Sequence, residues 1–333
     1  MVLLYSILMK YFFGPMSKNV VDTILDFSLK NSKYEMTFIP SRRQIEHDGG
    51  YVNNWTTEEF VKYVKSINPN VKIERDHGGP GQGNILDDGY DSLREDAKYM
   101  DIIHIDPWKQ YPILEEGISS TISMIQFCHN LRPDLEYEIG TEEAIRPYSV
   151  EELELIIKGV ERGLDPVIFQ QIKFAVIQCG TRLSQGNNIG TFDGEKLKKM
   201  VDLTKKYGLV AKEHNGDWVP LEIHQEKEKY GLTCVNIAPE MGKIESMVIL
   251  ERFHDNTDDF LNFYRLCIES GKWKKWVTPD FDFVQQKEEI ILISGHYVFS
   301  HPEFAELKQK YPDMDSEIQS RIYKTLLKYY GES

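Results

Sequence analysis

The sequence contains few cysteines, and none of them has the spacing of a zinc-binding motif. Its 333 residues include four cysteines, which lie far apart and form no CxxC pair. A zinc ribbon and a disulfide framework are therefore excluded, and we expect reduced, mostly buried thiols in a cytoplasmic protein. The four are Cys128, Cys179, Cys234 and Cys267.

Positive charge is also scarce. The chain has 39 lysines and arginines against 53 aspartates and glutamates, which gives a formal net charge of −14 at pH 7. A protein that binds nucleic acid needs a basic face to contact the phosphates. We therefore expect no nucleic-acid partner.

Long hydrophobic runs are missing as well. Lys10 interrupts the apolar N-terminus, residues 1–13, which is shorter than the roughly 20 apolar residues that span a bilayer. This stretch also lacks the basic region of a signal peptide. Two interpretations remain for it: a first strand of the fold, or an upstream extension with Met16 as the natural start. We expect no contact with a membrane.

Segments with strand character alternate with segments of helical periodicity along most of the chain. Strict alternation predicts a parallel sheet, and eight units in about 250 residues match a closed barrel. A doubly wound sheet has the same alternation, but the early GxGxxG of a dinucleotide-binding sheet is missing. We therefore predict a (β/α)8 TIM barrel over residues 1–254. Its strands are expected within residues 1–13, 34–40, 71–75, 101–106, 135–140, 173–178, 208–213 and 231–237.

The predicted helices carry recognisable start signals. Thr56 and Ser149 are expected to cap helices that end near residues 67 and 162. The other helices are expected at residues 19–29, 88–100, 118–128, 193–207, 218–230 and 241–252. The pattern changes to aromatic-rich helical segments at residue 255. We interpret residues 255–333 as a helical extension packed on the barrel and as a candidate subunit contact in a homo-oligomer.

Polar side chains follow nearly every predicted strand. The C-terminal ends of the strands are where a β/α barrel builds its active site. A single polar residue there is more often a plain loop residue, but two imidazoles and several carboxylates on one face predict a metal site or an acid–base site. His104 lies inside a strand and is expected to be structural, as are the histidines of helices and tail. The strand-end residues are Gln44, Asp76, His77, Asp106, Glu142, Gln178, Arg182, His214, Asn215 and Glu240.

Five short strings carry a resemblance to a known family. They are Gly49-Gly50-Tyr51, Asp76-His77-x-Gly79-Pro80, His104-Ile105-Asp106, Ile139-Gly140-Thr141-Glu142 and Glu213-x2-Gly216-Asp217. Their order and spacing, over about residues 19 to 250, resemble the accessory-subunit family of class II tagatose-bisphosphate aldolases. That family is a barrel related to zinc-dependent class II fructose-bisphosphate aldolases and to metal-dependent tagaturonate epimerases.

The resemblance implies roles for individual residues. Asp76 corresponds to the proton-transfer aspartate, and His77 and His214 correspond to metal ligands. A third histidine is expected between residues 178 and 182, where this chain has none. Glu142 or Glu138 is then expected to complete the shell. The implied metal is Zn²⁺, and oxygen ligands make Mn²⁺ or Mg²⁺ more competitive.

The resemblance also implies a reaction and a substrate class. A class II aldolase cleaves a phosphorylated ketose through an enediolate, and Asp106 and Glu142 are further candidates for acid–base roles. The expected substrate-binding residues are Gln44, Arg182, Asn215, Gly216, Glu240 and Lys243. Two alternatives remain: a metal-dependent epimerase acting on a keto-sugar, and a non-catalytic subunit that stabilises a separate catalytic aldolase subunit.

Overall fold

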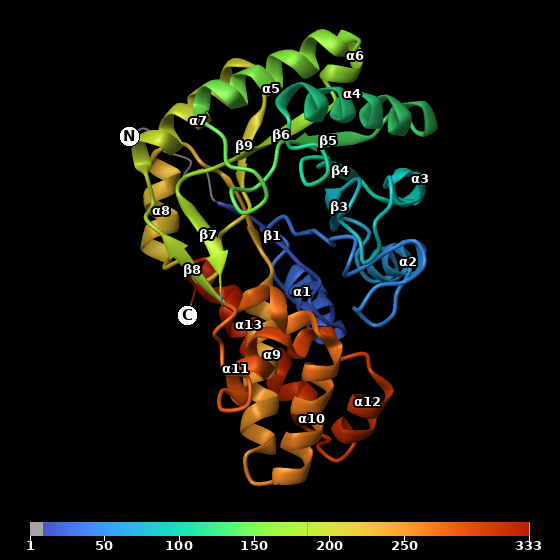
Figure 1. Ribbon diagram of the computed structural model, residues 1–333, viewed down its shortest axis with the longest axis vertical. Helices are drawn as coiled ribbons and strands as arrows, with labels where there is room; N and C mark the ends of the chain where they lie inside the picture. Colours follow the sequence, from blue (N-terminus) through green and yellow to red (C-terminus); the bar gives the residue numbers. More distant parts are fainter. Residues whose placement is uncertain (1–8, 185, 333) are drawn as a thin grey trace.

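The computed structural model describes residues 9–184 and 186–332. Its centre is a closed barrel of parallel strands in the spatial order β1-β10-β9-β6-β5-β4-β3-β2 (Figure 1). The strands are β1 (Lys10–Phe13), β2 (Thr37–Phe38), β3 (Lys72–Gly78), β4 (Ile102–Ile105), β5 (Glu136–Ile139), β6 (Ile172–Ile177), β9 (Val210–Glu213) and β10 (Cys234–Ile237). The predicted (β/α)8 TIM barrel is confirmed. The apolar N-terminus supplies β1, and residues 1–8 of that predicted strand lie outside the described residues.

Helices follow the strands in alternation. They are α1 (Lys18–Lys30), α2 (Thr57–Ile67), α3 (Tyr90–Tyr99), α4 (Leu114–Leu131), α5 (Val150–Gly163), α6 (Pro166–Phe169), α7 (Gly194–Lys206), α8 (Leu221–Lys229) and α9 (Pro239–Phe253). The predicted caps are confirmed, because Thr56 and Ser149 each form a capping box at the start of α2 and α5. The helix expected from residue 218 begins later, since Trp218 has a positive φ of 57° and Pro220 is the N-cap residue.

A short hairpin, which the sequence patterns did not predict, follows β6. Its strands β7 (Thr181–Ser184) and β8 (Asn187–Gly190) pair antiparallel outside the barrel. The Asn188 side chain donates hydrogen bonds to the backbone oxygens of Asn215 and Asp217, at 2.8 and 3.1 Å. The hairpin is thereby fixed to the loop that follows β9.

The predicted C-terminal helices are present. They are α10 (Thr257–Ser270), α11 (Lys287–Ser294), α12 (Pro302–Lys308) and α13 (Met314–Tyr329), with 3-10 turns η1 (Lys272–Trp276) and η2 (Gly295–Tyr297). Helices α10–α12 gather at the end of the molecule away from α4–α6, while α13 packs against α1 and α9 (Figure 1). Tyr330, directly after α13, stacks on Tyr34 with ring centroids 3.9 Å apart.

Part of this extension contacts loops at the carboxyl ends of the barrel strands. The Ser300 hydroxyl donates to the backbone oxygen of Tyr51 at 2.9 Å and accepts from the N–H of Asn53 at 2.7 Å. The Tyr297 ring lies edge-on to the Tyr51 ring, with centroids 4.8 Å apart. Residues 297–300 therefore lie at the end of the barrel where the active sites of such barrels are found.

The apolar core lies mainly between the barrel and its helices. A second, small cluster of Phe12, Ile39 and Cys234, with Phe174 against it, occupies the barrel interior. All four cysteines are buried and free. Among the described residues, no helix is both long and apolar enough to cross a membrane.

One buried histidine makes the stability depend on pH. Burial, reinforced by the charge of Lys227, lowers the pKa of His224 to about 4. An unfolded histidine titrates near 6.5, so the unfolded state binds more protons between these values. Stability is therefore fully present above pH 6.5 and is lost as the pH falls toward 4, by about 3 kcal/mol from this group.

Replacing this histidine with phenylalanine (His224→Phe) is expected to remove that part of the pH dependence. Urea unfolding of both proteins at pH 7 and at pH 4.5 measures it as the change in unfolding free energy between the two pH values. The control is His254→Gln, at an exposed position after α9. An identical pH dependence in wild type and His224→Phe would contradict the assignment.

Candidate active site

The end of β3 has an irregular backbone that brings two neighbouring residues to one site. Arg75 pairs with Ile103 and Gly78 with Ile105, so β3 has one extra residue, a β-bulge, at this point. His77 within the bulge has a positive φ of 50°. Neighbours in a regular strand point to opposite faces, so the bulge is what allows Asp76 and His77 to act together. Such strain, on the order of 1 kcal/mol or more, is typical of functional sites.

Asp76 and His77 meet two histidines from other strands. Asp76, His77, His104 and His214 each offer one potential metal-ligand atom, and these four atoms all lie within 4.8 Å of one another. We call these four residues the metal-ligand cluster. They come from β3, β4 and the loop directly after β9. The three imidazole centroids are 5.0 to 5.3 Å apart.

Each imidazole has one nitrogen held by an acceptor outside the cluster. Nδ1 of His77 lies 2.6 Å from Oδ2 of Asp106, and Nε2 of His214 lies 3.0 Å from Oε1 of Glu138. Nε2 of His104 lies 3.0 Å from the backbone oxygen of Gly140. These oxygens accept hydrogen bonds, so in the neutral form of each ring the other nitrogen carries a lone pair, which is the form that binds a metal ion. Metal-binding histidines usually have this arrangement.

The remaining ring nitrogens face the Asp76 carboxylate. Its oxygens lie 3.6 Å from Nδ1 of His104, 3.6 Å from Nδ1 of His214 and 3.7 Å from Nε2 of His77. Nδ1 of His214 and Oδ1 of Asp76 are buried and have no hydrogen-bond partner among the described residues. Nδ1 of His104 accepts only a 3.2 Å hydrogen bond from the His77 N–H. Unpartnered buried atoms that converge in this way fit a divalent cation.

Electrostatics keep Asp76 charged. Burial raises the pKa of its carboxyl group, but the charges of His77, His214 and His104 lower it well below the usual range. Burial lowers the pKa of His77, whereas Asp76 and Asp106 together raise it to about 10. The pKa of His104 is raised in the same way, against burial, chiefly by Glu138 and Asp76.

Asp106, a predicted catalytic residue, lies behind His77. It is fully buried and accepts hydrogen bonds from His77, from Thr141 Oγ1 at 3.1 Å and from Gln82 Nε2 at 3.1 Å, while its other oxygen accepts from the Trp108 N–H. A carboxylate surrounded by donors in this way orients the imidazole and has no direct access to a substrate.

A buried layer of charge lies under the cluster. Nζ of Lys212 donates to Glu74 at 2.7 Å and to Glu138 at 2.8 Å, and all three side chains are inaccessible to solvent. Although burial opposes it, the charges of Lys212 and His214 hold the pKa of Glu138 well below its usual range. Glu138 therefore remains an ionised acceptor for His214 and serves it as an orienting group.

The structure does not bring Glu142 into the cluster. It was expected to complete the shell, but the cluster's fourth ligand atom belongs to His104. In the segment where a third histidine was expected, the Gln178 side chain donates to the backbone oxygens of Thr141 and Arg146, both at 3.0 Å. Gln178 thus fixes the loop after β5.

Three of the predicted substrate-binding residues, Gln44, Gly216 and Asn215, are engaged in contacts within the protein. Both amide atoms of Gln44 are engaged, by the Ser41 N–H at 2.8 Å and by Met16 Sδ at 3.0 Å. Gly216 packs so closely on β10 that an added Cβ would lie 2.1 Å from a Val235 methyl group. Asn215 donates to the backbone oxygen of Thr181, and its buried Oδ1 has no partner among the described residues.

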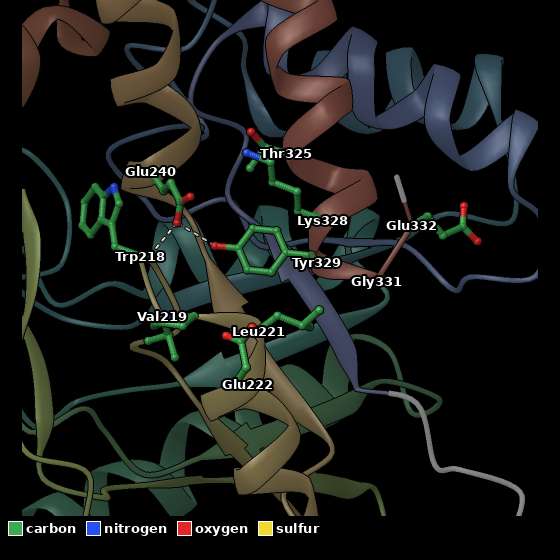
Figure 2. Close-up of a pocket in the computed structure, with 11 residues that line it drawn as sticks. Trp218, Val219, Leu221, Glu222, Glu240, Thr325, Lys328, Tyr329, Gly331 and Glu332 are labelled. Atoms are coloured by element: carbon green, nitrogen blue, oxygen red, sulfur yellow. Dashed lines mark hydrogen bonds between the residues drawn. The ribbon is translucent and has the colours of Figure 1, made fainter.

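The other three predicted substrate-binding residues, Arg182, Lys243 and Glu240, make no contact with the metal-ligand cluster among the contacts described. Arg182 is exposed on β7, and Lys243 donates to the backbone oxygen of Gly186 at 3.2 Å. The Glu240 carboxylate accepts from the Trp218 N–H at 2.5 Å and from the Tyr329 hydroxyl at 2.6 Å. Figure 2 shows it on the wall of a groove of about 570 Å³ beside α8 and α13. These contacts give none of the three a place in the cluster.

His104 is the residue that the sequence reasoning missed. It was expected to be structural because apolar isoleucines surround it in the strand. Side chains two apart share a face of a strand, so His104 and Asp106 point the same way. The same two-residue spacing joins Glu74 to Asp76 and Lys212 to His214. In all three strands, polar residues two positions apart therefore point to the same side, which is the interior of the barrel. This repeated spacing is the sequence signal that could have identified His104.

No protein-family model and no curated protein sequence matches this chain. Solved structures match its fold over nearly the whole length. A probable tagatose 6 phosphate kinase from Sinorhizobium meliloti 1021 is 14% identical, with 97% of this chain and 99% of that chain covered and a TM-score of 0.79.

Two further structures are similar at lower scores. The YdjI aldolase from Escherichia coli K12 is 12% identical, with 98% and 92% covered and a TM-score of 0.58. The fructuronate-tagaturonate epimerase UxaE from Cohnella laeviribosi, in a glycerol complex, is 10% identical, with 96% and 81% covered and a TM-score of 0.62. At these identities the comparisons establish a shared TIM-barrel fold.

Proposed function

We propose that this protein is a metal-dependent enzyme of carbohydrate metabolism that performs aldolase-type cleavage of a phosphorylated ketose. The observation that carries the proposal is the convergence of three imidazole nitrogens and the Asp76 carboxylate on one point of the barrel mouth. The aldolase and epimerase among the structures of similar fold support the same area of chemistry. The resemblance to the tagatose-bisphosphate aldolase accessory-subunit family does so as well.

The residues divide into two roles. His77, His104 and His214 would hold the cation, with Zn²⁺ the best match to three imidazoles and Mn²⁺ or Mg²⁺ as alternatives. Such a cation polarises a ketose carbonyl and stabilises the negative charge that develops on its oxygen. Asp76, ionised and with an unpartnered oxygen, is placed to take a proton from a substrate hydroxyl or carbon.

Two other functions use the same site differently. An epimerase acting on a keto-sugar needs the same carbonyl activation and proton transfer, and the UxaE-like fold favours it as the second candidate. A non-catalytic subunit that stabilises a separate aldolase is the third, in line with the accessory-subunit resemblance. In each case we propose a sugar or sugar phosphate as ligand and a homo-oligomer, or a complex with a catalytic aldolase subunit, as the assembly.

Metal content of the purified full-length protein tests the proposal. Elemental mass spectrometry after loading with Zn²⁺ or Mn²⁺ is expected to find close to one ion per chain, and His77→Ala and His214→Ala are expected to lose it. Incubation with ketose phosphates, followed by NMR, then separates the reactions. Three-carbon fragments support the aldolase, and an isomer of unchanged mass supports the epimerase. Absence of metal in the loaded wild type would overturn the proposal in favour of the subunit.

A further inference from the structure

Three cations of this acidic chain contact the loop that follows β3 and contains Gly79, Gly81 and Gly83, and a fourth follows one of them in η1. We call Arg43, Lys109, Lys272 and Lys275 the basic group. Three of its members donate to residues 81–84 of the loop, although they come from three distant segments of the chain. The contacts are Lys109 Nζ to Gly81 O at 2.6 Å, Arg43 Nε to Gly83 O at 3.4 Å and Lys272 Nζ to Asn84 Oδ1 at 2.9 Å.

Lys275 completes the basic group from the C-terminal extension. The residue is exposed overall, but its ammonium end lies 4.5 Å from the Trp276 ring centroid and 5.2 Å from that of Tyr297. Desolvation there, together with the charges of Arg43 and Lys272, lowers the pKa of Lys275 to about 7. Lys109 adds to this repulsion and Glu142 opposes it. The neighbouring cations thus make the positive charge of Lys275 less favourable than that of an isolated lysine.

The charge of the basic group is not neutralised within the described part of the chain. Arg43 is half-buried and the three lysines are exposed. The neighbouring Arg42, by contrast, is buried and pairs with Glu46 and Asp87. No member of the basic group forms an ion pair with a described carboxylate at 4.0 Å or less, and the acceptors around it are neutral oxygens. Collecting four such cations costs repulsion energy, which a bound anion would relieve.

The basic group lies beside the metal-ligand cluster. The loop it contacts also carries Gln82, whose Nε2 donates to Asp106, the partner of His77. A ligand at the basic group is therefore next to the reacting centre.

We propose that the basic group binds the phosphate of the substrate, so that the C-terminal extension supplies Lys272 and Lys275 to the active site. This inference rests on the proposed function, which it deepens by naming the group that holds the anionic end of the ketose phosphate. Four cations match a phosphate dianion better than a carboxylate, because a dianion pairs with more of the charge. The phosphate site is then distinct from Arg182 and Lys243, the two cations among the substrate-binding residues expected from the sequence.

Isothermal titration of the full-length protein with inorganic phosphate at pH 7.5 tests this site. Wild type is expected to bind phosphate, and Arg43→Gln and Lys275→Gln are expected to bind it about 10- to 100-fold more weakly. The matched control is Lys274→Gln, which removes an exposed lysine next to the basic group and is expected to bind like wild type. Acetate distinguishes the anion class: binding as tight as that of phosphate would show a carboxylate site and overturn the proposal.

Proton uptake gives an independent readout. Sulfate does not titrate near pH 7, so any proton taken up on its binding comes from the protein. A bound anion raises the pKa of Lys275, so an amine that was neutral at pH 7.5 takes up a proton. We expect an uptake of about half a proton or more per wild-type chain at this pH, and much less in Lys275→Gln. Titrations in two buffers of different ionisation enthalpy measure the uptake.

The failures of the two proposals are distinguishable. Phosphate binding that is absent in wild type at tens of millimolar, or unchanged in Arg43→Gln and Lys275→Gln, would overturn the phosphate site while metal binding persisted. Conversely, a chain that takes up no metal but binds phosphate through the basic group would overturn the proposed enzyme and leave the anion site standing. Thermal melting of each variant verifies that it is folded.

Discussion

Replacing His104 with alanine is expected to lower the affinity for Zn²⁺ by more than about 100-fold. Loss of a partner that merely orients a ligand costs about 10- to 100-fold, and the loss of a ligand itself costs more. His104 offers Nδ1 to the cluster while its Nε2 is held by the backbone oxygen of Gly140. Competition with a fluorescent zinc chelator measures the affinity of variant and wild type.

A second substitution separates metal binding from packing. In His104→Gln the side-chain amide is still able to donate to Gly140, but the imidazole lone pair is gone. We expect this variant to lose the metal too. The control is His129→Ala, a half-buried histidine of α4 that lies 2.9 Å from Gln171 Oε1. Wild-type zinc affinity in His104→Gln would assign His104 a structural role.

The sequence contains strong local signals for the fold and for three of the four residues of the metal-ligand cluster. Period-two strands and capped helices are local features, and they located the barrel and its strand ends. Asp76 and His77 stand out because glycines follow them directly, and His214 precedes Asn215-Gly216 in the same manner. The residues next to them in the sequence were therefore sufficient to identify these three as candidate site residues.

The remaining features depend on contacts between distant segments. His104 becomes a candidate ligand only when β4 lies beside β3 and faces the loop after β9, which is a property of barrel closure. The basic group is assembled from residues 43, 109, 272 and 275, which have no common sequence pattern. The bulge at His77 was also missed, since one extra residue leaves no clear mark on hydrophobic alternation.

The C-terminal extension contacts the barrel in two places. Through α13 it packs on α1 and α9, far along the chain from the residues that it covers. Through residues 272–300 it reaches the loops at the carboxyl ends of β2 and β3. The helical tail, predicted to pack on the barrel and to be a candidate subunit contact, thus reaches loops at the same end of the barrel as the metal-ligand cluster.

The substitution Asp76→Asn is expected to reduce kcat by about 10²- to 10⁴-fold, the usual contribution of a positioned acid or base. Asparagine keeps the size of the side chain but removes the charge that accepts the proton. The imidazoles remain in Asp76→Asn, so we expect close to one metal ion per chain, as in wild type. Incorporation of deuterium from D₂O into the substrate, followed by NMR, reports the proton transfer directly.

Asp106→Asn is the matched comparison, because it alters the carboxylate that holds His77 without touching Asp76. It is expected to weaken metal binding by about 10- to 100-fold and to recover activity when metal is added in excess. Asp76→Asn is expected to stay inactive at any metal concentration. If Asp76→Asn instead lost the metal and regained full activity on metal addition, Asp76 would be a ligand, and the proton-transfer role would pass to another residue of the site.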